Sequence, residues 1–91
     1  MADIAEVMKA LASEPRLRIL QLLKCRTLCV NAITKKLGVT QSAVSQHLRI
    51  LRKAGLIMPD KRGYWIHYSV NPDAMTRCAQ AMNRLFSVQE R

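Results

Sequence analysis

Two short amphipathic segments separated by only three residues constrain this chain more than any other feature. In VNAITKKL, residues 30–37, and in QSAVSQHLRILRK, residues 41–53, the apolar side chains recur at the spacing of one helix face. Between them lies GVT, with Gly38 suited to end the first helix and Thr40 suited to cap the second. Two helices joined by so short a turn form a helix-turn-helix, which we predict over about residues 30–54.

Further helical periods flank this unit. An amphipathic segment runs from Ile4 to Leu11, and a second helix follows Ser13, which is suited to cap it and has Pro15 in its first turn. A last helix is predicted over about residues 72–88. Its apolar stripe consists of Met75, Cys78, Ala79, Met82, Leu85 and Phe86.

Between the helix-turn-helix and the last helix, the apolar period changes from helical to alternating. The segment LIMPDKRGYWIHYSV predicts two strands around a turn at DKRG, where Gly63 supplies a positive φ. This β-hairpin, over about residues 57–70, carries Lys61 and Arg62 at its tip and takes the place of a wing. We therefore predict a mainly α fold with one small hairpin, a winged helix-turn-helix, in a single domain over residues 1–91.

The distribution of charge indicates the class of partner. The chain has a formal net charge of +9, and no Asp or Glu lies between Glu14 and Asp60, an interval that holds nine Lys and Arg residues. A surface of one sign over the middle half of the chain favours nucleic acid as the partner over a surface tuned only for solubility.

The polar residues of the second helix suit contacts with DNA. A helix-turn-helix places its second helix in the major groove, where Gln and Ser exchange hydrogen bonds with base edges and Arg and Lys hold phosphates. A basic wing reaches the backbone or the neighbouring minor groove, and the alternative is that Lys61 and Arg62 are only solvated turn residues.

The two terminal helices offer more apolar surface than one small core can cover. A symmetric dimer would bury the excess and would set two recognition helices about 34–36 Å apart on a pseudo-palindromic operator. The alternative is that these helices cap only the core of their own subunit.

Three segments, ALASEPRLRILQLL, LCVNAITKKLGVTQSAVSQHLRILRKAGLI and RGYWIHYSVNP, resemble those of the ArsR (ArsR/SmtB) family of winged helix-turn-helix repressors. The resemblance spans residues 4–72 and implies four helices, two strands and a final helix. It also implies a homodimer formed by the first and last helices, bound to an operator and released by a ligand, often a metal or metalloid. Gln41, Ser42, Ser45, Gln46 and His47 then sit where family members contact DNA, and with Thr40, Arg49, Lys61 and Arg62 they form the predicted DNA-binding set.

The sensing residues of better-known relatives are incomplete in this chain. Arsenic-responsive members begin the third helix with Cys-Val-Cys-Asp-Leu, whereas CVNAI keeps Cys29 and has Asn31 in place of the second thiol. Zinc-responsive members carry His on the last helix, and this last helix has none. His47 and His67 lie in different elements, and each is expected to be structural or DNA-facing rather than a metal ligand.

Three cysteines, Cys25, Cys29 and Cys78, remain as candidates for sensing. Cys29 directly precedes a helix, near Arg26 and Lys35, a setting that favours thiolate. As(III), another soft metal, or a redox or sulfur signal read at these thiols would then release the DNA. The alternative is that the thiols are buried or incidental, with Cys78 a small core residue and no cofactor.

Several other classes of protein are not expected. An odd number of cysteines fits a reducing compartment, no apolar run approaches the roughly 20 residues of a membrane span, and no signal peptide is visible, so we expect a cytoplasmic protein. With 6 acids and no nucleophile beside a base, an enzyme is not expected.

Two hypotheses stay open: a dimeric DNA-binding repressor of its own operon, and a ligand-independent winged-helix adaptor that binds protein or RNA.

Overall fold

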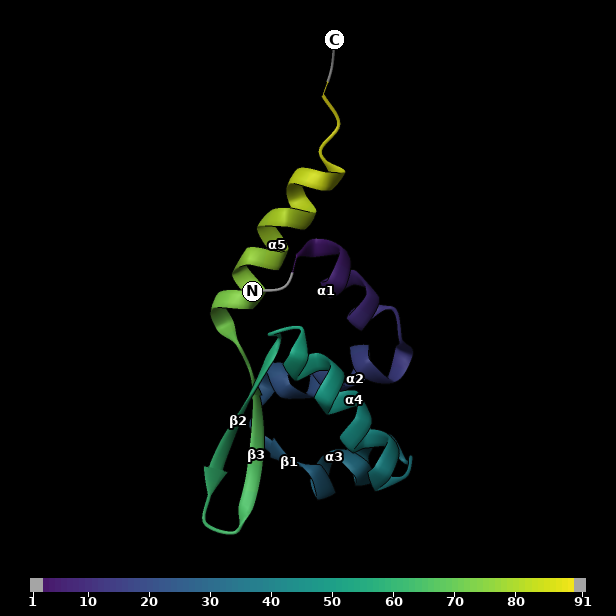
Figure 1. Cartoon of the computed structure of the whole chain (residues 1–91), viewed down its shortest axis with the longest axis vertical. Coiled ribbons are helices and arrows are strands. Elements are labelled where there is room, and N and C mark those ends of the chain that lie inside the picture. The colour runs from purple at the N-terminus through teal and green to yellow at the C-terminus, as the bar shows by residue number, and fades with distance from the viewer. Residues whose placement is uncertain (1–2, 90–91) are drawn as a thin grey trace.

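Figure 1 shows a computed structural model of the chain, in which residues 3–89 are described. The helices and strands follow one another in the predicted order, with one strand added before the helix-turn-helix. The elements are α1 (Ile4–Leu11), α2 (Glu14–Cys25), β1 (Leu28–Cys29), α3 (Val30–Leu37), α4 (Gln41–Lys53), β2 (Ile57–Arg62), β3 (Trp65–Val70) and α5 (Pro72–Phe86).

Local signals in the sequence set the helix boundaries, as predicted. The Ser13 hydroxyl accepts a hydrogen bond from the Arg16 N–H at 3.4 Å, and the Thr40 hydroxyl accepts one from the Ala43 N–H at 3.1 Å. Each bond satisfies one of the N–H groups that a helix start leaves without a backbone partner. Gly38 ends α3 with a φ of 72°, in the left-handed region where a side chain would be strained.

The end of α4 is fixed by a Schellman motif. After the last helical residue, Lys53, and the cap residue Ala54, Gly55 adopts a φ of +81°. The Leu56 N–H then donates to the Leu51 carbonyl at 3.0 Å, and the Gly55 N–H donates to the Arg52 carbonyl at 2.9 Å. The chain therefore leaves α4 in a direction that leads straight into the wing.

The wing belongs to a three-stranded antiparallel sheet in the order β1-β3-β2. The sequence analysis missed β1, which has only two residues and pairs Leu28 with Tyr68 and Cys29 with His67. The hairpin turn is also shorter than predicted, because β2 continues through Lys61 to position 62, which pairs with Trp65. Gly63, with a φ of 63°, and the next residue alone form the turn, which begins three residues later and ends one residue later than the turn predicted at DKRG.

The core gathers apolar residues from α1 through β2, including the inward stripes predicted for α3 and α4. Helix α5 adds Ala74 and rests Met75 and Cys78 against the core before it extends away from the body of the molecule (Figure 1). The cluster consists of Val7, Ala10, Ile19, Leu20, Leu23, Leu28, Ile33, Leu37, Val44, Leu48, Leu51, Ala54, Leu56 and Ile57.

Helix α5 ends at Phe86, two residues before the predicted end near residue 88. The C-terminal half of α5 is largely exposed to solvent, since Leu85 is 58% and Phe86 is 67% exposed. Within residues 3–89, no helix is both long and apolar enough to cross a membrane.

The conformation of Gly55 yields a test of the turn that connects α4 to the wing. Open space surrounds the position, so an added Cβ would meet no atom within 4 Å and any cost would come from the backbone. We expect Gly55→Ala to lower the free energy of unfolding by about 1–2 kcal/mol, measured by urea titration. Gly55→Asn should cost less, because Asn tolerates the left-handed region, and equal losses for both variants would contradict this account.

Candidate nucleic-acid interface

Helix α4 is held by one apolar side and presents a polar side to solvent. Val44, Leu48 and Leu51 are at most 2% exposed, and their spacing places them on one face. The opposite face carries exposed polar and basic side chains and no acid. These outward residues are Ser42, Ser45, Gln46, Arg49, Arg52 and Lys53.

Two residues at the start of α4 have different environments. Thr40 is exposed, but its hydroxyl is already engaged as the cap of α4, so its direct role in the structure is to start the helix. Gln41 is also exposed and faces the wing, where it lines a groove of about 210 Å³ with Asn31 of α3 and Trp65 of β3. Both elements expected to meet DNA therefore border this groove.

Unlike Ser42, Ser45, Gln46 and Arg49 of the predicted DNA-binding set, His47 is half-buried and does not lie on the outward face of α4. The Arg16 guanidinium of α2 lies against it, with Nη1 at 3.2 Å from the imidazole Nδ1. Because a guanidinium has only donors, Nδ1 is the acceptor and the ring is neutral, with its proton on Nε2. Burial first, and the nearby Arg16 charge second, hold the pKa of His47 below its ordinary value.

The tip of the wing carries exposed aromatic residues that the sequence analysis did not select. Tyr64 is 100% exposed in the turn, and Trp65 is 58% exposed at the start of β3. Lys61 and Arg62 were predicted at the tip, but they are the last two residues of strand β2, where Lys61 is exposed. An aromatic residue next to Gly in a predicted turn is the signal that would have pointed to Tyr64, since a turn tip rarely buries a side chain.

The three cysteines do not come together in one site. Cys25 at the end of α2 is exposed, whereas Cys29 and Cys78 are half-buried on β1 and α5. Burial raises the pKa of the Cys78 thiol, which leaves it less reactive. Among residues 3–89, no three Cys, His, Asp or Glu side chains are grouped so that they could hold a metal ion.

Cys29 nevertheless lies where the two elements expected to meet DNA come together. It occupies the cap position of α3 without a side-chain capping bond, as its place before a helix predicted. It also lines the groove between Gln41 and the wing. Across the sheet it pairs with His67, whose Nδ1 is buried and has no hydrogen-bond partner in the described part of the chain.

An acid-free helix face held by a buried stripe, preceded by a three-residue turn and flanked by a basic hairpin, defines a DNA-binding protein of the winged helix-turn-helix class. A family model for bacterial regulatory proteins of the arsR family matches residues 13–58. The chain belongs to the ArsR family of transcriptional regulators and is not an enzyme.

Individual relatives agree with this assignment over most of the chain. The HTH-type transcriptional regulator YbzH of Bacillus subtilis is 40% identical, over 81% of this chain and 89% of its own length. The arsenical resistance operon repressor of Escherichia coli is 33% identical, over 93% of this chain and 74% of its own length. Among solved structures, the homodimeric winged helix-turn-helix DNA-binding domain of Mb0332 from Mycobacterium bovis matches with a TM-score of 0.76 and 29% identity, over 97% of this chain and 86% of that one.

Proposed function

We propose that this protein is a homodimeric repressor that binds a pseudo-palindromic operator of its own operon. One observation carries the proposal: the outward face of α4 carries hydrogen-bonding and basic side chains and no acid, opposite a fully buried stripe. Phosphates repel acids, and the chain has none between Glu14 and Asp60.

The roles of the side chains follow from their positions on α4 and the wing. Ser42, Ser45 and Gln46 lie in the first two turns of α4, where a recognition helix meets base edges. Arg49 one turn later and Lys61 on the wing are placed for phosphates. Gln41 faces the groove beside the wing and would contact the backbone that runs there.

The proposal is tested by measuring binding to DNA from upstream of the gene and to random DNA of equal length, by fluorescence anisotropy across a salt series. A repressor of this kind should prefer its upstream DNA by at least about a thousandfold, with affinity falling steeply as salt rises. A winged-helix adaptor would bind RNA or protein instead, or would bind DNA without preferring a sequence.

Base contacts and backbone contacts should respond differently to substitution. Gln46→Ala should lower the preference for operator over random DNA by about tenfold, because it removes hydrogen bonds to base edges. Lys61→Ala should weaken binding to both DNAs alike and reduce the salt slope by about one, because it removes one phosphate contact. The same change in preference from both variants would refute these assignments. Arg62→Ala is expected to act as Lys61→Ala does.

The proposal of a dimer rests on α5. Its apolar stripe continues past the core to Leu85 and Phe86, which are more than half exposed in one subunit. A second copy that packs its own α1 and α5 against this stripe would remove that surface from water. The homodimeric state of the Mycobacterium bovis domain supports the proposal of a dimer.

We therefore expect Leu85→Glu combined with Phe86→Glu to give a monomer in sedimentation analysis. The monomer should still unfold cooperatively, because both side chains are exposed within the subunit, but at a lower temperature than the dimer. Operator affinity should fall at least about tenfold as the two half-sites become independent. Gln80→Glu, on the opposite side of α5, is the matched control and should remain dimeric. A dimer that survives the double substitution would place the interface elsewhere.

A thiol signal is the release mechanism that the positions of the cysteines support best. Of the three thiols, Cys29 lines the groove shared by α3, α4 and the wing, so an adduct on it would occupy space beside Gln41 and Trp65. One thiol suffices for an oxidant or electrophile. As(III) or another soft metal would have to draw further thiols from a second subunit, since no such group forms within the described residues of one chain.

Release is measured by anisotropy of the reduced protein on its operator before and after addition of As(III) or a mild thiol oxidant. We expect at least about a tenfold rise in Kd for the wild type and for Cys25→Ser, and none for Cys29→Ser, because only Cys29 borders the DNA-reading elements. Release that persists in Cys29→Ser would exclude this thiol, and binding indifferent to both agents would leave a repressor whose cysteines are structural.

A further inference from the structure

A single side chain of α2 links α1 to the recognition helix α4. The Arg16 guanidinium donates through Nε to the Ala10 carbonyl and through Nη2 to the Lys9 carbonyl at 3.5 Å, both in the last turn of α1. Its remaining nitrogen, Nη1, donates to Nδ1 of His47 at 3.2 Å. The planar guanidinium of Arg16 thus donates to backbone carbonyls at the end of α1 and to the imidazole of His47 on α4.

The position of Arg16 in α2 explains why its guanidinium is directed toward α1 and α4. It is the third residue after the Ser13 cap, at the helix end where the dipole disfavours a cation. The carbonyls of Lys9 and Ala10 lie at the C-terminal end of α1, where the helix dipole favours a cation. The guanidinium is therefore directed away from α2 and toward α1 and α4.

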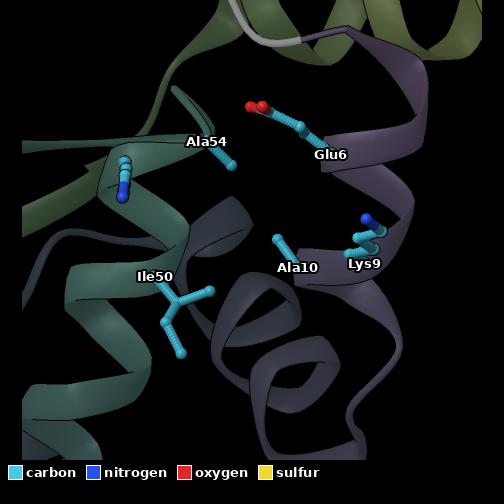
Figure 2. A pocket seen from close by; sticks show the side chains of 6 residues that line it. Glu6, Lys9, Ala10, Ile50 and Ala54 are labelled. Atoms are coloured by element: carbon cyan, nitrogen blue, oxygen red, sulfur yellow. The ribbon is translucent and has the colours of Figure 1, made fainter.

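Elsewhere along this side, α1 and α4 do not close on one another. A groove of about 390 Å³ separates them, lined on α4 by Ile50 and Ala54 and on α1 by Ala10. Figure 2 shows Ile50 and Ala10 on opposite sides of this groove, with Glu6 extending across it. Within residues 3–89, His47 is the α4 side chain that hydrogen-bonds to another helix.

We propose that the Arg16–His47 contact fixes the rotation of α4 relative to α1 and thereby sets how well the protein discriminates its operator from other DNA, and that only the neutral imidazole makes this contact. Arg16 is then a positioning residue that acts through His47. The inference rests on the proposed function as a sequence-specific DNA-binding protein. It adds a coupling between the helix expected at the dimer interface and the helix expected to meet bases.

The contact is sensitive to pH because protonation removes its acceptor. A protonated imidazole has donors on both nitrogens and would face the Arg16 cation. The charged groups on the surrounding elements are Arg16 of α2, Glu6 and Lys9 of α1 and Lys53 of α4, and Arg16 is the one in contact with the ring. Since the pKa of His47 lies below its ordinary value, the contact is intact at neutral pH and is lost as pH falls through that pKa.

The test compares two substitutions of His47 that leave Arg16 and the α1 carbonyls in place. His47→Asn keeps an acceptor oxygen near the position of Nδ1 but cannot titrate, whereas His47→Ala removes the acceptor. The readout is the ratio of Kd for random DNA to Kd for the operator, at pH 7.5 and along a series of decreasing pH, because general attraction to phosphates cancels in this ratio. Thermal unfolding of each variant confirms that it is folded under the assay conditions.

At pH 7.5 we expect His47→Ala to lower the ratio by about tenfold and His47→Asn to keep it near the wild-type value. Lowering the pH through the pKa of His47 should lower the ratio for the wild type and for His67→Asn, the control for the other histidine, but not for His47→Asn. Arg16→Gln should lower the ratio in the wild-type background and add nothing to His47→Ala, as expected for a residue that acts through another.

Three results would overturn the proposal. A loss in His47→Asn as large as in His47→Ala would show that the imidazole itself contacts DNA. Parallel pH profiles for the wild type and His47→Asn would show that His47 is not the titrating group. Additive losses from Arg16→Gln and His47→Ala would show that Arg16 acts independently. A wild-type protein with no preference at pH 7.5 would instead refute the proposed function.

Discussion

Burial of three aliphatic side chains on α4 determines what the rest of the interface can do. Val44, Leu48 and Leu51 are essentially inaccessible to solvent, and removing such side chains from water contributes about 1.5–3 kcal/mol each. Any rotation of α4 about its axis would expose part of this stripe. The helical period then directs Ser42, Gln46 and Arg49 outward together. The buried stripe decides which side chains face outward, and the Arg16–His47 contact is proposed to set the final orientation of that face relative to α1.

The two remaining sides of α4 connect it to different parts of the molecule. On one side His47 meets Arg16 and, through it, the end of α1. On the other side Gln41 borders the groove that contains Cys29 and the first residues of β3. The apolar face carries no ionisable group, whereas the two sides border an imidazole and a thiol.

Much of this fold could be predicted because its signals are local. Ser13, Thr40 and Gly38 act within one helical turn, and the stripes of α3 and α4 need only a helical period. The strand β1 has two residues and gains its identity from pairing with Tyr68 and His67, which no local pattern reveals. The Arg16–His47 contact joins residues 31 positions apart, and the turn at Gly63 depends on the register of two strands. For the candidate site, the outward residues of α4 followed from periodicity, whereas the half-burial of His47 required the tertiary structure.

The short strand β1 also changes the mechanical character of the wing. It pairs with β3 only at Tyr68 and His67, so the root of the hairpin is held by backbone hydrogen bonds on both edges. Beyond that point Ile66 and Trp65 pair only with β2, and Tyr64 stands free in solvent. The far end of the wing therefore has fewer strand-pairing hydrogen bonds than its root. In the proposed complex, such a tip would adapt to the width of a DNA groove without displacing α3, which continues directly from β1.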